Sequence, residues 1–209
     1  MRTISRSGSH ELDVKKSRFL CALTHATTEE EAKEFVRQQR RLHHEARHHC
    51  SAYVLGDDGQ TQKSSDDGEP AGTAGIPMLE VLRRNNITNT VAVVSRYFGG
   101  VLLGAGGLIR AYGGAVSETL DRVGLAERLS VRLVSTTVNH ALAGKLENDL
   151  RSSGYALTDV QYAEQVRFDL HIPDSDVAEF ATWLAEATGG VATISLGESV
   201  YTEVPADRA

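Results

Sequence analysis

Two glycine-containing segments of the chain hold the residues best suited to chemistry. Residues 64–77 carry three carboxylates among serines and glycines, and residues 95–112 carry an arginine near each end of a glycine-rich run. Neighbouring carboxylates bind hard cations such as Mg²⁺, or act as acid and base when each shifts the pKa of the other. A glycine-rich turn with flanking arginines suits an anion or an acidic partner. These residues are Asp66, Asp67, Glu69, Arg96 and Arg110.

The glycine-rich run follows an apolar stretch, residues 91–94, which is typical of a buried strand that ends in a tight turn. Because a helix is expected next, its N-terminal amides could point toward a bound anion. The run lacks the Gly-Lys-Ser/Thr end of a Walker sequence. Glycine is also required wherever a helix packs closely on a strand, so packing is an alternative explanation. The candidate ligand-binding glycines are Gly99, Gly100, Gly104, Gly106 and Gly107.

The three carboxylates allow three interpretations. They could bind a divalent metal in a hydrolase or phosphoryl-transfer enzyme, with the Gly99–Gly107 loop holding a phosphate. They could form a partner or ligand site together with His48, Tyr53 and Tyr97. They could also be structural, because Asp-Asp-Gly is typical turn chemistry. One carboxylate could pair with Arg96 or Arg110 and thereby lock the two loops together.

Histidines are concentrated just before the first of these segments. Zinc binding by this cluster would require four ligands at suitable spacing, and the only thiol outside it is Cys21. We therefore expect no metal, and we keep a zinc site as an alternative. Cys50 and His48 share a strand face and could form a nucleophile and base, but no third orienting group is evident. We expect His48 and Cys50 to pack beneath the loops and the other histidines to be solvated. The cluster comprises His43, His44, His48, His49 and Cys50.

The elements that position these residues can be predicted from periodicity and turn signals. Lys15-Lys16 lies at a turn between two strands, and Thr27 with Glu30 forms a capping box. Gly124 is the expected end of a helix. In residues 1–128 we expect strands at 10–14, 17–25, 50–55 and 91–97, helices from 27 to about 41, 77 to 84 and 106 to 123, and a long loop at 56–74.

The rest of the chain, residues 129–209, is predicted to form a second domain. Strands are expected at 129–138, 155–162, 165–172 and 191–204, with helices at 140–153 and after Pro173. The resulting β-α-β-β-α-β order is the ferredoxin-like arrangement. The sequence therefore predicts an α+β protein of two domains, residues 1–128 and 129–209.

Charge is divided unevenly along the 209 residues. Residues 1–135 hold 18 lysines and arginines against 16 acidic residues, whereas residues 136–209 hold 4 against 12. Phosphate contacts dominate nucleic-acid affinity, so RNA would bind the N-terminal part. The alternative is an ordinary solvated helix face plus a charged turn. The basic candidates are Lys15, Lys16, Arg18, Arg37, Arg40, Arg41 and Arg47.

Two cysteines and the absence of a signal peptide or a long apolar run favour a cytoplasmic protein with free thiols. No membrane association is expected.

Several motifs in one order resemble the IMPACT (YigZ-type) family over about the first two thirds of the chain. They begin with Lys16-Ser17-Arg18-Phe19 and His43-x-x-Ala46-x-His48-x-Cys50-x-Ala52-Tyr53. They continue with Asp66-Asp-Gly-Glu-Pro70, Gly72-Thr-Ala-Gly75, Pro77, Arg96-Tyr-Phe-Gly-Gly100 and Leu103-Gly-x-Gly-Gly-Leu108-x-Arg-Ala-Tyr112. The sequence departs from the family at His44, where proline is usual, and at His49, where asparagine is usual.

The resemblance implies a first domain of the left-handed βαβ ribosomal-protein type and a second domain similar to the last domain of elongation factor G. It also implies a binding or regulatory protein linked to translation, with no catalysis and no cofactor. Its eukaryotic members regulate a translational stress kinase by competing for a ribosome-associated activator. The expected partner is the ribosome, RNA or a translation-related protein, with no DNA sequence specificity. Fold analogy does not fix function, so a metal-dependent enzyme stays the alternative.

Overall fold

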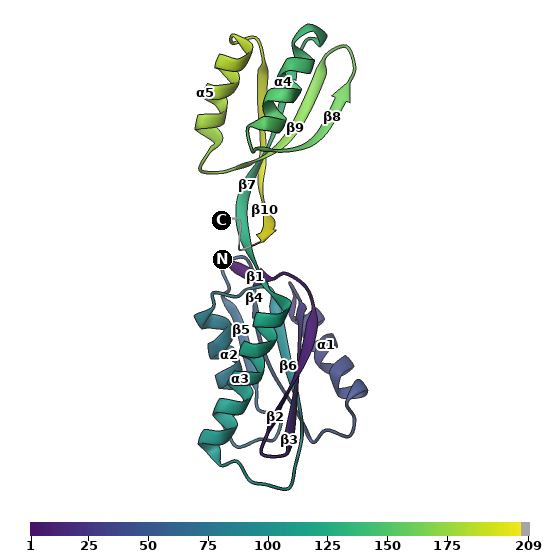
Figure 1. Cartoon of the computed structure of the whole chain (residues 1–209), viewed down its shortest axis with the longest axis vertical. Coiled ribbons are helices and arrows are strands. Elements are labelled where there is room, and N and C mark those ends of the chain that lie inside the picture. Colours follow the sequence, from purple (N-terminus) through teal and green to yellow (C-terminus); the bar gives the residue numbers. More distant parts are fainter. Residues whose placement is uncertain (206–209) are drawn as a thin grey trace. The chain divides into compact units, whose positions relative to one another are not determined.

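The computed structural model of the chain describes residues 1–205 and contains two compact units. The first is Met1–Arg128 and the second is Leu129–Thr202, while the end of the last strand, from Glu203, groups with the first unit. Figure 1 shows the elements of each unit along the chain. No helix among the described residues has the length and apolar content that a membrane crossing requires.

A five-stranded sheet forms the centre of the first unit, in the order β2-β3-β6-β4-β5. Its neighbouring strands all pair antiparallel. Lys15 and Lys16 both have positive φ, 47° and 68°, which closes the β2–β3 hairpin with a two-residue turn. The strands are β2 (Gly8–Val14), β3 (Ser17–His25), β4 (His48–Leu55), β5 (Thr61–Ser65) and β6 (Thr90–Tyr97).

Helices cover both faces of this sheet (Figure 1). Because alternate strand residues face opposite sides, Cys50, Ala52 and Val54 of β4 pack with the helices α2 (Gly75–Arg84) and α3 (Ala105–Val123). Tyr53 and Leu55 pack on the other face with α1 (Glu29–Leu42). The Gly99–Gly107 segment thus joins the central strand β6 to a helix on one face.

Three local predictions required correction. The capping box uses Thr28 and Glu31 instead of Thr27 and Glu30. The run Thr27-Thr-Glu-Glu-Glu31 offers both frames, and in the observed one Glu31 also accepts the backbone amide of Thr27 at 2.7 Å. The expected loop at 56–74 contains the edge strand β5. A short strand, β1 (Arg2–Ile4), was missed because it is defined by pairing with residues that are distant in the sequence, mainly 125–127.

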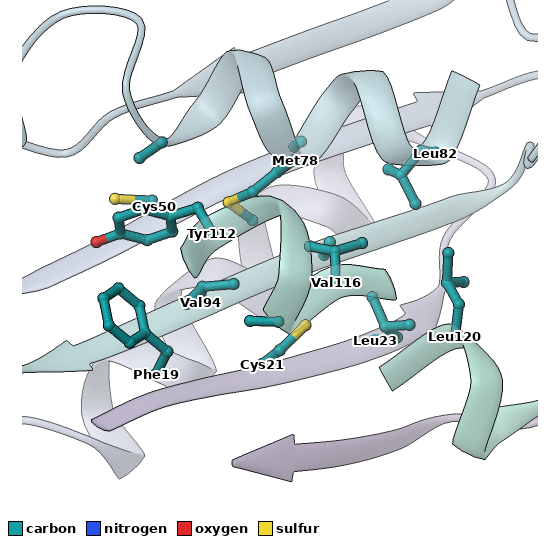
Figure 2. Close-up of a cluster of buried hydrophobic side chains, with 14 of the residues drawn as sticks. Phe19, Cys21, Leu23, Cys50, Met78, Leu82, Val94, Tyr112, Val116 and Leu120 are labelled. Atoms are coloured by element: carbon teal, nitrogen blue, oxygen red, sulfur yellow. The ribbon is translucent and has the colours of Figure 1, made fainter. Parts of the chain in front are cut away.

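The core between the sheet and the helices α2 and α3 contains two aromatic rings (Figure 2). Phe19 and Tyr112 are fully buried and meet edge to face with ring centroids 5.1 Å apart. Cys50 lies beside Tyr112, and Met78 and Leu82 of α2 cover the same layer (Figure 2). The polar edge of this core, at the Tyr112 hydroxyl, is where the candidate site is found.

The second unit confirms the predicted β-α-β-β-α-β order. Its sheet has β7 between β9 and β10, with β8 beyond β9. Phe168, Phe180 and Leu150 are buried between this sheet and the two helices. The elements are β7 (Leu125–Val138), α4 (His140–Ser152), β8 (Ala156–Tyr162), β9 (Val166–Pro173), α5 (Val177–Thr188) and β10 (Thr193–Pro205).

Candidate functional site

A buried ion pair connects the two glycine-containing segments. Arg96 Nη1 donates to Glu69 Oε1 at 2.7 Å, and the side chains of both residues are at least nine-tenths buried. The Tyr112 hydroxyl donates to the same carboxylate oxygen at 2.8 Å. The Arg96 guanidinium also lies 5.3 Å from the centroid of the Phe19 ring. Of the alternatives left open by the sequence, the structure contains the one in which a carboxylate pairs with Arg96.

The start of the glycine-rich loop is held against the β2–β3 turn. Ser17 Oγ accepts a hydrogen bond from the Gly99 amide at 3.1 Å. A Cβ atom on Gly99 would lie 1.9 Å from the Lys16 carbonyl oxygen, so only glycine fits at this position. Gly100 and Gly104 have positive φ and open space around them. Glycine is therefore required at position 99 by close packing, whereas at positions 100 and 104 it permits a backbone conformation with positive φ.

Asp66 organises the entry to α2. Its carboxylate accepts the backbone amides of Gly72, Ala74 and Gly75 at 2.8–3.0 Å. Ala74 is the N-cap residue of α2 and has no polar side chain, so Asp66 supplies the cap from outside the helix. Burial alone would raise the pKa of Asp66, but the three amides outweigh it and lower the pKa below its ordinary value.

Asp67 connects this segment to β4 and α1. Its Oδ2 accepts the His49 amide at 2.7 Å, and its Oδ1 accepts from Arg40 at 2.8 Å. His48 Nδ1 lies 2.9 Å from the Asp67 carbonyl oxygen. With φ at 42°, Asp67 occupies the left-handed region, which aspartate tolerates in turns. The carboxylates of Asp66, Asp67 and Glu69 thus all have protein partners.

The histidine and cysteine cluster does not form a metal centre in the described part of the chain. Among the side chains that the structure describes, no three histidine, cysteine, aspartate or glutamate residues are grouped so that they could hold a metal ion. His49 was expected in solvent but is buried, with Nδ1 2.9 Å from Ser95 Oγ, because the two residues pair across β4 and β6. Burial raises the pKa of both Cys21 and Cys50 to about 12, which leaves the thiols protonated.

Two predicted site residues lie away from the Glu69–Arg96 pair. Arg110 is exposed on α3 and lines a groove between α2 and α3. Tyr53 lies on the opposite face of the sheet, beneath α1. Gly106 and Gly107 are in the first turn of α3, where the N-cap Gly104 provides no side-chain cap. Arg96 and Arg110 therefore do not share one anion site, although they bracket the loop in sequence.

Aromatic and basic side chains instead gather where the β2–β3 turn, the start of β4 and the end of β6 meet. The Arg18 guanidinium lies 4.6 Å from the Tyr97 ring centroid, and the Arg47 guanidinium lies 6.0 Å from that of Phe98. His43 Nδ1 lies 3.0 Å from the Tyr97 hydroxyl. We call this surface the aromatic–basic end, and it comprises Lys15, Lys16, Arg18, Arg47, Tyr97 and Phe98.

The loop beyond this surface is unusually apolar for exposed chain. Phe98 is 43% exposed and Leu102 is 84% exposed, and Val101 between them is also exposed. The remaining basic candidates are on α1: Arg37 and Arg41 pair with Glu34, and Arg40 pairs with Asp67.

Sequence reasoning missed Tyr112, Ser17 and Phe98. Tyr112 and Ser17 stood inside the recognised motifs, but nothing in their spacing indicated contact with Glu69 or Gly99. Phe98 could have been found, because an aromatic residue directly before Gly99-Gly100 in a turn is poorly placed for burial.

Family models match both parts of the chain. Residues 15–120 match the Impact N-terminal domain, and residues 136–191 match a domain of unknown function, DUF1949. The chain is 46% identical over 201 residues to the IMPACT family member YvyE of Bacillus subtilis, covering 96% of this chain and 93% of that one. It is 42% identical over 183 residues to YigZ of Escherichia coli, covering 85% and 88%.

The chain is also similar to a eukaryotic protein and to a solved crystal structure. A protein IMPACT homolog of Saccharomyces cerevisiae is 32% identical over 104 residues, which is 47% of this chain and 39% of the yeast protein. A crystal structure of a hypothetical protein superposes with a TM-score of 0.60 and 36% identity, covering 94% of this chain and 97% of that one.

Proposed function

Because the chain belongs to the IMPACT family, we propose that it is a cytoplasmic regulatory protein that contacts the ribosome through RNA at its aromatic–basic end. The protein acts by binding, and it catalyses no reaction. The eukaryotic family members suggest the link to translation. The observation that carries the proposed contact is the arrangement of arginines over the partly buried ring of Tyr97 and the exposed ring of Phe98.

The chemistry of this surface suits single-stranded RNA. Aromatic rings stack on unpaired bases, and guanidinium groups beside them contact phosphates. Tyr97 and Phe98 offer two rings on consecutive residues, with Arg18 and Arg47 beside them. The turn that carries Lys15 and Lys16 packs directly under Gly99. The side chains of all four cations, two lysines and two arginines, are exposed. They are therefore accessible to the phosphates of an RNA.

The Glu69–Arg96 pair supports this function by fixing the loop that carries Phe98. A pair buried beside Phe19 and Tyr112 holds the end of β6 in one arrangement. A rigid loop loses little conformational entropy when it binds, which increases affinity. The carboxylates that a metal-dependent hydrolase would use are instead engaged with backbone amides, two arginines and a tyrosine.

The test is sedimentation of the purified protein with ribosomes through a sucrose cushion at low and at moderate salt. We expect co-sedimentation at low salt that declines as salt rises, because phosphate contacts release counterions. The double variant Lys15→Glu/Lys16→Glu and the variant Phe98→Ser should both remain in the supernatant. Lys145→Glu, on the exposed face of α4, is the matched charge control and should sediment like the wild type.

Two results would contradict the proposal. A wild-type protein that stays in the supernatant at every salt concentration has no ribosome contact of this kind. The second result is a Lys15→Glu/Lys16→Glu variant that sediments with ribosomes like the wild type while Phe98→Ser stays in the supernatant. Removal of two phosphate-binding charges must weaken an RNA contact, so this result would assign the surface to an apolar contact with a protein.

A further inference from the structure

A groove of about 300 Å³ lies on the opposite face of the first sheet from the Glu69–Arg96 pair. One wall is α1, and the floor is formed by β4 and the edge strand β5. Four cationic side chains line it, together with three serines and the apolar surfaces of Val36 and Tyr53. The cations are Lys33, Arg37, Arg40 and Lys63, and no carboxylate is among the lining residues.

A helical periodicity on α1 and a cross-strand pairing between β4 and β5 place these residues together. Lys33, Val36, Arg37 and Arg40 stand at i, i+3, i+4 and i+7, which is one face of a helix. Tyr53 pairs directly with Lys63 across β4 and β5, so both point to the face that α1 covers. The groove is therefore a fixed feature of the helix and sheet, with no long loop among its walls.

Three of the four cations also contact carboxylates outside the groove. Lys33 pairs with Glu29 at 3.1 Å, Arg37 with Glu34 at 2.7 Å and Arg40 with Asp67 at 2.8 Å. These pairs are about half exposed. They hold the cations in place without using all their donors, since a guanidinium has five N–H donors and an ammonium has three. Among the side chains that the structure describes, none of the ion pairs involves Lys63, although its charge acts on the nearby Glu29 carboxylate.

The floor contains a buried tyrosine hydroxyl that lies beside a carboxylate. The Tyr53 hydroxyl is buried and makes no short hydrogen bond, but it interacts with the Glu29 carboxylate as a longer hydrogen bond. Burial first, and then Glu29, raise the pKa of Tyr53 to about 12, so the hydroxyl keeps its proton.

We propose that this groove binds a small molecule carrying two or more linked phosphate groups. Lys33 and Arg40 are seven residues apart, which is about 10 Å along a helix, so the positive charge extends over more than one phosphate. Serine hydroxyls and guanidinium groups are typical phosphate donors, and Val36 offers an apolar surface to the rest of the ligand. This site goes beyond the proposed RNA contact, and neither depends on the other.

Isothermal titration of the whole protein with inorganic pyrophosphate and with ADP tests the site. We expect both to bind in the presence of moderate salt, with adenosine showing no binding because it lacks phosphate. Lys63→Gln should weaken binding about tenfold, the cost of one charge-assisted contact. Arg37→Gln should weaken it similarly, whereas Lys145→Gln, an exposed lysine in the second unit, should match the wild type.

Circular dichroism of each variant shows whether the fold is retained, and Lys63 on an edge strand is the variant least able to disturb it. Absence of heat with pyrophosphate and ADP would overturn the proposal, as would binding that Lys63→Gln and Arg37→Gln leave unchanged. A short poly-aspartate peptide that binds more tightly than pyrophosphate would also overturn it, by assigning the groove to an acidic protein segment. The ribosome experiment uses other residues, so each proposal can fail alone.

Discussion

Arg96 and Glu69 are 27 residues apart in sequence, yet their side chains meet inside the first unit at 2.7 Å. Arg96 is the penultimate residue of the central strand β6, whereas Glu69 belongs to the turn before α2. The Tyr112 hydroxyl of α3 donates to the same Glu69 carboxylate. The three side chains thus connect β6, the turn before α2, and α3, and these elements support the loop that carries Phe98. Arg96 is therefore a poor probe of partner binding, because its replacement disturbs the core.

Replacement of one member of this pair should be strongly destabilising. Glu69→Ala leaves the buried Arg96 without a counter-charge, which typically lowers the free energy of unfolding by about 3–5 kcal/mol. Urea denaturation of the two proteins measures the difference. Glu11→Ala is the control, because the Glu11–Arg18 pair is exposed and 3.8 Å apart, and exposed pairs are worth about 0–1 kcal/mol. Equal effects for the two variants would contradict a buried, structurally important Glu69.

Asp66 should make stability depend on acid pH. Burial raises its pKa, but the three amides prevail and hold the folded-state pKa below the ordinary 3.8. The carboxylate therefore stabilises the folded state fully above pH 3.8 and loses this contribution as pH falls through the folded-state pKa. Asp66→Asn should be less stable at neutral pH, and its unfolding free energy should approach that of the wild type as the solution is acidified.

Denaturant titrations from neutral pH to below pH 3 measure this convergence. Asp13→Asn, which changes an exposed residue of β2, serves as the control and should follow the wild type at every pH. Parallel curves for Asp66→Asn and the wild type would show that the amide contacts do not favour the ionised form.

Two glycines should respond oppositely to alanine. At Gly99 the new Cβ would lie 1.9 Å from the Lys16 carbonyl, so Gly99→Ala must displace backbone and should cost about 1–3 kcal/mol or more. At Gly144, in the exposed middle of α4, a Cβ meets nothing within 4 Å, so Gly144→Ala should stabilise by about 0.5–1 kcal/mol. Thermal unfolding monitored by circular dichroism distinguishes them, and an unaffected Gly99→Ala would exclude the close packing of this loop on the β2–β3 turn.

Both thiols should be unreactive in the folded protein. Cys21 and Cys50 are fully buried, and burial raises the pKa of each to about 12, so the nucleophilic thiolate is scarcely populated at pH 8. Titration with a chromogenic disulfide reagent should show almost no reaction in buffer and two reactive groups per chain in denaturant. Rapid reaction of one thiol in the folded protein would restore Cys50 as a candidate nucleophile.

Elements with a strong local signal were predicted well from the sequence. The Lys15-Lys16 hairpin, the helix ending at Gly124 and the β-α-β-β-α-β order of the second unit all appear in the structure. The strands β1 and β5 were missed, because a short polar strand such as Thr61–Ser65 becomes a strand only through pairing with its neighbour. The capping box shifted by one residue, because Thr27 and Thr28 offer the same chemistry.

The family, the α+β class and the two segments that contain the polar residues of interest could all be identified from the sequence. The tertiary structure alone decided how those residues pair: Glu69 with Arg96 and Tyr112, Asp66 with the amides of α2, and Arg110 with none of them. The reason is physical. Periodicity and turn chemistry act between residues close in the chain, whereas a buried charge is paired by whichever partner the packing of distant strands and helices brings within reach.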